Sequence, residues 1–413
     1  MTHKTDATNG TDAIILQGNN HPQNPINPGS DNGPAEEVHE ELIARASVPP
    51  RLTKEETGRR RLENEQVLKQ QPHSLWYYSW RRMRRNKLAM IGLAITILLI
   101  VVAVFAPVLA PFDPNLQVLE YSTEPLGFHG NVLITKSEVD PNLTIPIPIA
   151  EFRIKGDRVI YTNDEGLDKS IPISRLAGNS EKEWHKTPTY YLGTDRFGRD
   201  VLSRLMYGAR VSLTVAFFAE LCSLVIGVLI GSIAGFYRGW VDDGLMWFTN
   251  VVWSIPSLLL IIAISIALGL GMWQTIFAIG ITEWVDMARI VRGQFFSLRE
   301  TEYVEATKAL GLSNKRTIFR HILPNSLGPI IVIATAGFAN AIIYEASLSF
   351  LGLGVQPPTS TWGQMIHDGY GFIAAGANWG LTIFPALAIM MAVFAFNLFG
   401  DGLRDAFDPK LKR

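Results

Sequence analysis

The residues best placed to do chemistry lie in a polar segment, Ser297–Asn325, which separates two long apolar stretches. Its first half carries the carboxylates of Glu302 and Glu305 and the phenol of Tyr303. Polar groups without partners are costly in an apolar medium, so such a segment has little role inside lipid. We therefore predict that it docks a soluble partner beside a membrane; a merely structural cytoplasmic loop is the alternative.

Capping signals divide this segment into two short helices joined by a glycine. Ser297 and Glu300 form a capping box, so the first helix is expected to begin directly after Ser297. Gly311 supplies the left-handed residue that ends it. Ser313 then caps a second helix, which is expected to end before Pro324. Two helices with a glycine elbow form a rigid knob that could transmit force to neighbouring spans.

One face of the first helix suits contact with another protein. Tyr303, Ala306 and Leu310 share a stripe at helical spacing. Ala306 and Ala309 keep the surface flat enough for another backbone to approach closely. We expect recognition here rather than catalysis.

Sequence patterns for catalysis or cofactor binding do not occur elsewhere. The histidines have no metal-ligand spacing. G-x-S-x-G, H-E-x-x-H and the P-loop pattern G-x-x-x-x-G-K-[ST] are missing. The net charge of −1 gives no general attraction to nucleic acid. The chain is therefore predicted to be no enzyme and to bind no metal, cofactor or nucleic acid.

The elements that position the polar segment are predicted membrane spans. The 413 residues are 47% hydrophobic and only 18% charged, which indicates that part of the chain lies in a bilayer. A helix needs about 20 apolar residues to cross it. Pro256 and Pro385 are expected to kink the third and sixth spans. The six predicted spans are Leu88–Phe112, Val211–Tyr237, Leu245–Leu268, Met272–Ile290, Ser326–Leu348 and Gly380–Phe399.

Basic residues set the predicted orientation of these spans. Lysines and arginines cluster before the first span, between the fourth and fifth, and after the sixth. The loops between spans three and four and between spans five and six contain neither residue type. By the positive-inside rule, both termini are expected in the cytoplasm. The first apolar stretch begins too deep in the chain for a cleaved signal peptide.

The chain divides into four predicted parts. Residues 1–73 are expected to be a disordered or partly helical cytoplasmic tail, with a helix from about Thr53 to Gln70. Residues 74–112 join an aromatic and basic interfacial helix to the first span. Residues 113–190 form an extracytoplasmic insertion, which either contacts a partner or is passive. Residues 191–413 form the core transmembrane domain.

The insertion is predicted to be small and partly β. Glu151–Ile154 and Val159–Tyr161 flank a short turn and are expected to form a hairpin. Leu143–Ile149 contains two prolines and could only be an edge strand. The predicted fold class is therefore an all-α polytopic membrane protein with six transmembrane helices, cytoplasmic coupling helices and a small β-containing insertion.

Several ordered motifs resemble those of one transporter family. Glu305-Ala306-Thr307-x-x-x-Gly311, followed by Ile322-Leu323-Pro324-Asn325, resembles the EAA loop of bacterial ABC-importer permeases. Thr307 stands where a second alanine is usual. His321 stands where the general pattern has isoleucine, and the sequence His-x-Leu-Pro-Asn is similar to the peptide-importer branch. The remaining motifs similar to that branch are Arg85–Leu88, Gly193–Val201, Glu345–Gly354 and Gly402–Pro409.

This resemblance implies the second, C-type permease subunit of the dipeptide/oligopeptide/nickel family. Such a chain forms half of a translocation pathway for peptides, nickel or another small solute in the cytoplasmic (inner) membrane. Its implied partners are membrane lipid, a homologous second permease, two ATPase subunits that bind ATP and Mg, and an extracytoplasmic solute-binding protein. The residues implied to contact an ATPase are Glu302, Tyr303, Glu305, Ala306, Ala309, Leu310 and Gly311.

Polar residues inside the spans raise further expectations. A charged side chain costs about 2.5–3.5 kcal/mol at mid-bilayer, so each acid should face protein or water. Asp286 is expected to pair with Arg289, and Glu283 lies near the cytoplasmic end of its span. Glu345, inside a family motif, is predicted to shape an outer gate or to contact the partner permease. Glu220 receives no predicted role.

Two alternatives come from other classes. A secondary transporter driven by an ion gradient would be expected to show repeats and organised charges at mid-span, which this sequence lacks. A sensor would need an output domain in the cytoplasm, and none is recognisable. Co-purification with an ATPase would separate the importer from both.

Overall fold

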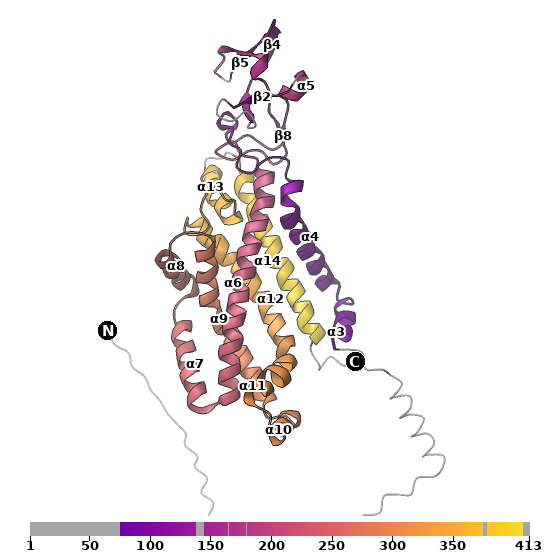
Figure 1. Cartoon of the computed structure of the whole chain (residues 1–413), viewed down its shortest axis with the longest axis vertical. Helices are drawn as coiled ribbons and strands as arrows, with labels where there is room; N and C mark the ends of the chain where they lie inside the picture. The colour runs from indigo at the N-terminus through magenta and orange to yellow at the C-terminus, as the bar shows by residue number, and fades with distance from the viewer. Residues whose placement is uncertain (1–74, 138–143, 164, 179, 375–377, 408–413) are drawn as a thin grey trace, which may run out of the picture. The chain divides into compact units, whose positions relative to one another are not determined.

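A computed structural model describes residues 75–137, 144–163, 165–178, 180–374 and 378–407 of the chain. The predicted tail, including its helix from Thr53 to Gln70, lies outside these residues. Most described residues are helical (Figure 1). The helices are α3 (Leu75–Met83), α4 (Lys87–Leu109), η1 (Leu119–Tyr121), η2 (Ile173–Arg175), α5 (Glu181–Trp184), α6 (Val201–Tyr237), α7 (Gly239–Trp253), α8 (Ser257–Leu268), α9 (Met272–Leu298), α10 (Glu302–Ala309), α11 (Asn314–Arg316), the π-helix η3 (Thr317–Ile322), α12 (Leu323–Phe350), α13 (Trp362–Ala374) and α14 (Gly380–Phe407).

Within the described part of the chain, four helices are long and apolar enough to cross a membrane. They are α4, α6, the continuous helix Asn314–Phe350 and α14. Helix α9 also has sufficient length, but it carries four charged residues: Glu283, Asp286, Arg289 and Arg292. The chain is thus a largely helical, multi-pass membrane protein.

The third span was predicted to be a single kinked helix, and this prediction is wrong. Helices α7 and α8 meet at an angle of 87°, so together they form at most one broken span. The break falls at Ser254–Pro256. Proline removes a backbone donor and its ring disfavours helical geometry at the preceding residue, Ile255, which ends α7 there rather than bending it. Pro385, by contrast, lies inside an uninterrupted α14.

Helix α6 is the central element of the bundle, packed along α9 and also against α4 and α12. Three glycines recur at intervals of four on α6, Gly227, Gly231 and Gly235, and they form a seam that lies against α9. A Cβ atom built on Gly227 would lie 2.6 Å from the Cβ of Met287, and one on Gly231 would lie 2.8 Å from the Cβ of Val291. Small residues allow this backbone approach between helices in lipid. The seam therefore joins two helices of this chain.

Replacing Gly231 with leucine is expected to destabilise the bundle. The added side chain would force α6 and α9 apart, at a cost of about 1–3 kcal/mol for overpacking. Gly244→Leu on exposed α7 is the matched control, because nothing lies within 4 Å of a Cβ atom there. Unfolding of the purified variants in detergent measures the difference. Equal stability of the two variants would contradict the close packing of α6 against α9 at Gly231.

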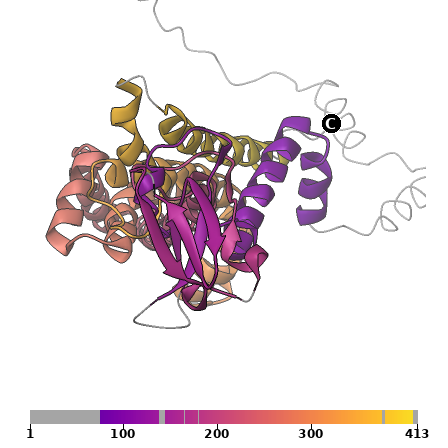
Figure 2. The ribbon, with the colours of Figure 1, turned by 90° about the horizontal axis from the view of Figure 1, so that it is seen from above.

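The segment between α4 and α6 contains the predicted β structure (Figure 2). Its hairpin is confirmed, since β4 pairs antiparallel with β5 and Phe152 lies opposite Tyr161. The proline-containing strand is also confirmed at an edge, with β3 pairing only on β2 in the order β3-β2-β7. The strands are β1 (Phe128–His129), β2 (Val132–Lys136), β3 (Thr144–Pro148), β4 (Glu151–Lys155), β5 (Arg158–Thr162), β6 (Asp168–Pro172), β7 (His185–Lys186) and β8 (Thr189–Tyr190).

Candidate functional site

The first helix of the polar segment, residues 297–325, begins later than predicted. Helix α9 continues to Leu298, and α10 starts only at Glu302 after the N-cap residue Thr301. The capping box at Ser297 is therefore wrong as a helix start. The side chain of Phe295 is fully buried in the core, so the backbone around Ser297 stays helical as the last turn of α9. The core packing outweighs the local capping preference.

Gly311 ends α10 as predicted. Its φ angle is +71°, in the left-handed region that favours glycine. The Gly311 amide donates to the Lys308 carbonyl at 2.9 Å, and the Leu312 amide donates to the Thr307 carbonyl at 3.1 Å. These two bonds are the Schellman pattern, which satisfies the last carbonyls of a helix.

The second helix of the segment does not end before Pro324. It runs from Asn314 into α12 without a break, through the π-helical turn Thr317–Ile322. In this turn the Leu323 amide bonds to the carbonyl of Ile318, five residues back. The wider turn accommodates Pro324, which lies in the first turn of α12 and has no backbone donor. The segment is thus joined directly to a long apolar helix.

Helix α10 presents an exposed face and is anchored by a buried one. Val304 is buried in the cluster that contains Phe295, Ile318 and Ile322, and the buried hydroxyl of Thr307 lies 3.3 Å from that of Thr317. The predicted contact residues all lie on the other side and are exposed: Glu302, Tyr303, Glu305, Ala306, Ala309, Leu310 and Gly311. Leu310 is 78% exposed, which is unusual for leucine on a structured helix. We call these seven residues the α10 face.

Three arginines fix the base from which α10 projects. Arg292 binds Asp242 through two hydrogen bonds of 2.5 and 2.6 Å, which ties α9 to α7. Arg238, between α6 and α7, forms an ion pair of 2.8 Å with Glu300 and lies over the ring of Phe296. Arg299 donates to the backbone carbonyl at the end of α6. These contacts therefore hold together the ends of α6, α7 and α9 from which α10 projects.

Glu345 lies within α12 and is fully buried. Its two carboxylate oxygens accept hydrogen bonds of 2.7 Å each, one from Ser212 of α6 and one from Ser349. The Ser212 hydroxyl also accepts the backbone amide of Trp362 at the start of α13. Glu345 thus links α6, α12 and α13 inside this chain. Direct contact with a partner subunit, one of its two predicted roles, does not fit this burial.

Removing the Glu345 carboxylate is expected to weaken this junction. Glu345→Ala would leave the hydroxyls of Ser212 and Ser349 without their buried acceptor, at about 1–3 kcal/mol for each lost partner. Glu345→Gln keeps one acceptor oxygen and should lose less. Unfolding of purified protein gives the comparison, and equal losses in the two variants would argue against a hydrogen-bonding role.

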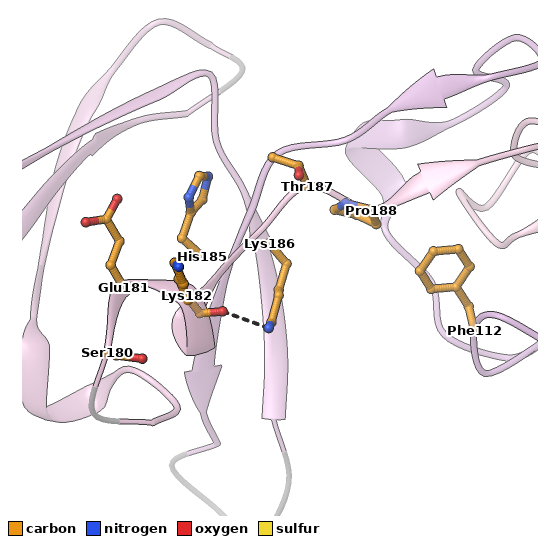
Figure 3. Close-up of a pocket in the computed structure, with 8 residues that line it drawn as sticks. All are labelled: Phe112, Ser180, Glu181, Lys182, His185, Lys186, Thr187 and Pro188. Carbon is orange, nitrogen blue, oxygen red and sulfur yellow. Dashed lines mark hydrogen bonds between the residues drawn. The ribbon is translucent and has the colours of Figure 1, made fainter.

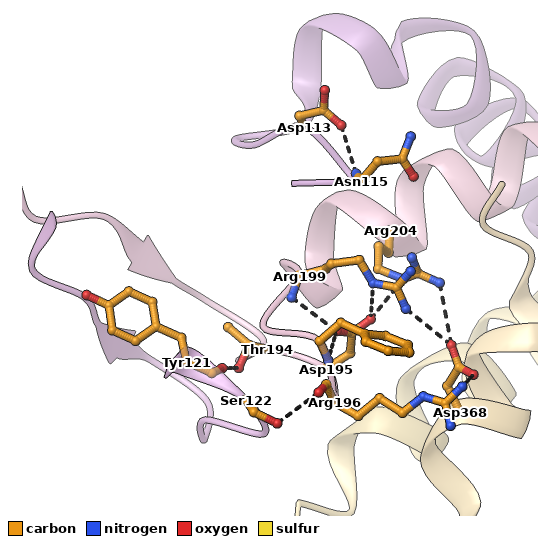
Figure 4. A network of polar contacts seen from close by, with 11 residues as sticks. Asp113, Asn115, Tyr121, Ser122, Thr194, Asp195, Arg196, Arg199, Arg204 and Asp368 are labelled. Carbon is orange, nitrogen blue, oxygen red and sulfur yellow. Dashed lines mark hydrogen bonds and ion pairs between the residues drawn. The ribbon is translucent and has the colours of Figure 1, made fainter. Parts of the chain in front are cut away.

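A second polar cluster lies at the start of α6 and was not predicted (Figure 4). Asp195 forms ion pairs with Arg199 at 2.7 Å and with Arg204 at 3.3 Å. Asp368 of α13 pairs with Arg196 at 2.8 Å and with Arg199 at 3.3 Å. Four of these five side chains are buried; Arg196 is the exposed member. The motif Gly193–Val201 therefore fastens α13 to the start of α6.

The same motif also contacts the β-containing segment. The Thr194 hydroxyl donates to the Tyr121 carbonyl, and the Ser122 hydroxyl donates to the Arg196 carbonyl at 2.9 Å. Asp200 caps α6 by accepting the Ser203 amide at 2.7 Å. Burial raises the pKa of Asp200, and its hydrogen bonds with Ser203 act in the opposite direction. The closely spaced opposite charges in Asp195–Arg204 were a sequence signal for the local ion pairs. The pairing with Asp368 could not be inferred, because that residue is too distant in the sequence.

The remaining acids in the helices differ in their surroundings. Glu220 is buried in α6 beside Gly337 of α12. Glu283 lies near Ser257 and Tyr344. The predicted pairing of Asp286 with Arg289 is wrong, because Arg289 instead donates to Asn250 at 2.8 Å and lies over the ring of Trp253. The ring of Trp253 and the side-chain amide of Asn250, both on α7, hold the Arg289 guanidinium in place of the Asp286 carboxylate.

An open pocket of about 850 Å³ lies in the β-containing segment (Figure 3). It extends from Phe112 to Lys182, where the Lys186 ammonium donates to the Lys182 carbonyl at 2.7 Å. Its eight lining residues are exposed or half-buried, so no buried polar group is held ready for a ligand. Within the described ranges, no group of three or more His, Cys, Asp or Glu side chains could hold a metal ion. The α10 face remains the better candidate.

Comparison with known proteins identifies the class. Residues 227–413 match the family described as the inner membrane component of binding-protein-dependent transport systems. Residues 74–125 match the N-terminal transmembrane domain of oligopeptide transport permease C. These matches define a membrane permease of the ATP-binding-cassette importer type.

Similarity to individual proteins defines the branch. The chain is 38% identical to the dipeptide transport system permease protein DppC of Alkalihalophilus pseudofirmus, over 82% of this chain and 91% of that protein. The oligopeptide permease OppC of Bacillus subtilis has the same identity and coverage. The glutathione permease GsiD of Escherichia coli is 35% identical, again over 82% and 91%. The chain belongs to this family of importer permeases, as a second, C-type subunit.

Family membership decides between the predicted classes. A permease subunit of this kind is a transport protein and not itself an enzyme. The ion-gradient transporter considered as an alternative finds no support in these matches. The resemblance inferred from the EAA-like loop and the accompanying motifs is confirmed.

Proposed function

We propose that this chain forms half of the translocation pathway of a peptide importer and is driven through the α10 face. The relatives named for dipeptide, oligopeptide and glutathione transport support a peptide or a similar small solute as cargo. A homologous permease would form the other half, and an extracytoplasmic binding protein would deliver the cargo. Two ATPases would bind and hydrolyse ATP with Mg on their own chains.

The observation that carries this proposal is the contrast between the two sides of α10. Seven exposed residues form one face, while Val304 and Thr307 hold the other side against the core. A free helix face with two carboxylates, a tyrosine and a leucine suits a groove on a soluble subunit. Since α11 and α12 continue from the same segment, movement of the face would be passed to a membrane helix.

The proposed topology has six crossings. It counts the broken pair α7–α8 as one crossing and includes α9 despite its charges. Both termini would lie in the cytoplasm, together with α10, and residues 113–190 would lie outside. Glu345, at the far end of α12 from η3, would help to shape an outer gate. Normal uptake and normal ligand-stimulated ATPase activity in Glu345→Gln would remove that role.

The proposal is tested by purifying the chain with its native partners and crosslinking from a single cysteine at position 310. Cys222, the only cysteine of the natural chain, is first replaced by serine. A crosslink to an ATP-hydrolysing subunit that changes in yield with nucleotide is expected. A cysteine at position 244, on exposed α7, serves as the control site. Absence of an ATPase from the complex, or equal crosslinking from both sites, would overturn the proposal.

A further inference from the structure

A groove among four membrane helices is not used by the coupling mechanism. It has a volume of about 500 Å³ and is lined by residues of α4, α6, α12 and α14. Phe217 and Phe218 of α6 and Val104 of α4 are exposed at its walls, and Phe338 of α12 is partly buried. Apart from Thr214 and Arg210, every lining residue is apolar. The groove therefore resembles a site for a hydrocarbon chain with one polar end.

The polar end is defined by Arg210. Its side chain is exposed, and the hydrogen bonds and ion pairs found among the described residues do not include its guanidinium. The groove contains no acidic residue that could neutralise it. An arginine in a membrane helix is costly unless it reaches an anion or water, so an anionic group at this position would be stabilised.

The long side chain of Arg210 can extend from its position in α6 toward the level of lipid headgroups. The Phe112 amide, just beyond the end of α4, bonds to the Ser203 hydroxyl of α6 at 3.1 Å, which sets these two residues at one level. Arg210 lies seven residues further along α6, about 10 Å deeper at 1.5 Å per residue. A long arginine side chain extends back toward the interface. Its guanidinium can therefore reach the phosphate region, while the ring of Phe217 lies deeper, beside the acyl chains.

We propose that this groove binds an anionic phospholipid from the leaflet on the side of residues 113–190. The phosphate would lie on Arg210, and one acyl chain would follow the groove between α4 and α6. Phosphatidylglycerol fits the charge, whereas the ammonium of phosphatidylethanolamine finds no acidic partner among the lining residues. Lipid occupancy would stabilise the packing of α4 on the bundle. The inference rests on the groove and does not depend on coupling through α10.

Lipid retention by the purified importer complex tests this proposal. After delipidation, the complex is titrated with phosphatidylglycerol or phosphatidylethanolamine, and bound lipid is counted by native mass spectrometry. One phosphatidylglycerol per chain should bind roughly fivefold more tightly than phosphatidylethanolamine, the factor that corresponds to about 1 kcal/mol for one interfacial arginine. Arg210→Gln should abolish this preference, and Arg210→Lys should keep it.

A second pair of variants separates the groove from the general lipid surface. Val104→Trp would fill the groove and reduce binding of either lipid, whereas Val108→Trp lies one turn away, outside the lining, and should bind as the natural chain does. Equal affinity for both lipids, or an unchanged preference in Arg210→Gln, would overturn the proposal. So would a raised KM for peptide uptake in Arg210→Gln with unaltered lipid binding, because the groove would then belong to the substrate path.

Discussion

Gly311→Pro is expected to abolish ATP-driven uptake while the protein still inserts into the membrane. Proline fixes φ near −65°, whereas this position has a φ angle of +71°. Proline also removes the amide that bonds to the Lys308 carbonyl. The last turn of α10 would then lose its Schellman pattern, and the α10 face would turn away from its proposed groove. Peptide uptake into proteoliposomes of the reconstituted importer is the measurement.

Two further variants at Gly311 distinguish backbone conformation from side-chain size. The space around this residue is open, because nothing lies within 4 Å of a Cβ atom built there. Asparagine adopts the left-handed conformation more readily than most other residues, so Gly311→Asn should retain most of the uptake. Gly311→Val, which resists that conformation, should lose most of it. Uptake by the proline variant at the natural rate would show that the end of α10 has no part in coupling.

Ala306→Trp is expected to reduce uptake by roughly tenfold or more, since a steric clash that costs only 1.4 kcal/mol of docking free energy already lowers affinity tenfold. Ala306 lies in the middle of the α10 face and is exposed, so the larger side chain should not disturb folding. The amount of ATPase that co-purifies with the chain should fall in parallel. Both quantities can be measured on the same preparation.

Lys308→Trp is the matched control for this substitution. Lys308 is also exposed on α10, but it lies two positions away, on a different side of the helix from Ala306. The same bulk placed there should leave co-purification and uptake close to the natural values. If both tryptophan variants lose uptake equally, α10 is sensitive to bulk in general and the docking face is wrongly assigned.

The exposed face and its glycine stop were predictable because their signals are local. Ala306, Leu310 and Gly311 lie within two helical turns, and helical spacing alone places the first two on one stripe. The hairpin around Lys155–Arg158 was predictable for the same reason, since alternation and a short turn fix its register. The glycine seam on α6 also follows from spacing, although its partner helix does not.

The errors arose where packing or a distant residue decides the conformation. Burial of Phe295 extends α9 through a residue that favours a cap. A π turn accommodates Pro324, which by local rules ends a helix, whereas Pro256 does break its helix. The identity of Asp368 as the partner of Arg199 depends on the tertiary fold. Local propensity gives a preference at each of these positions, and the three-dimensional context determines the outcome.

Under the proposed topology, the uninterrupted helix from Asn314 to Phe350 would synchronise events at the two sides of the membrane. Its first turns adjoin α10, and its last turns hold Glu345 and Ser349 in the buried junction with α6. Because an intact helix resists stretching, a displacement at one end is felt at the other without delay by an intermediate step. Two spectroscopic reporters at opposite ends of this helix should therefore change with a single time constant. In the proposed importer, cargo admission and nucleotide turnover would then be one concerted event.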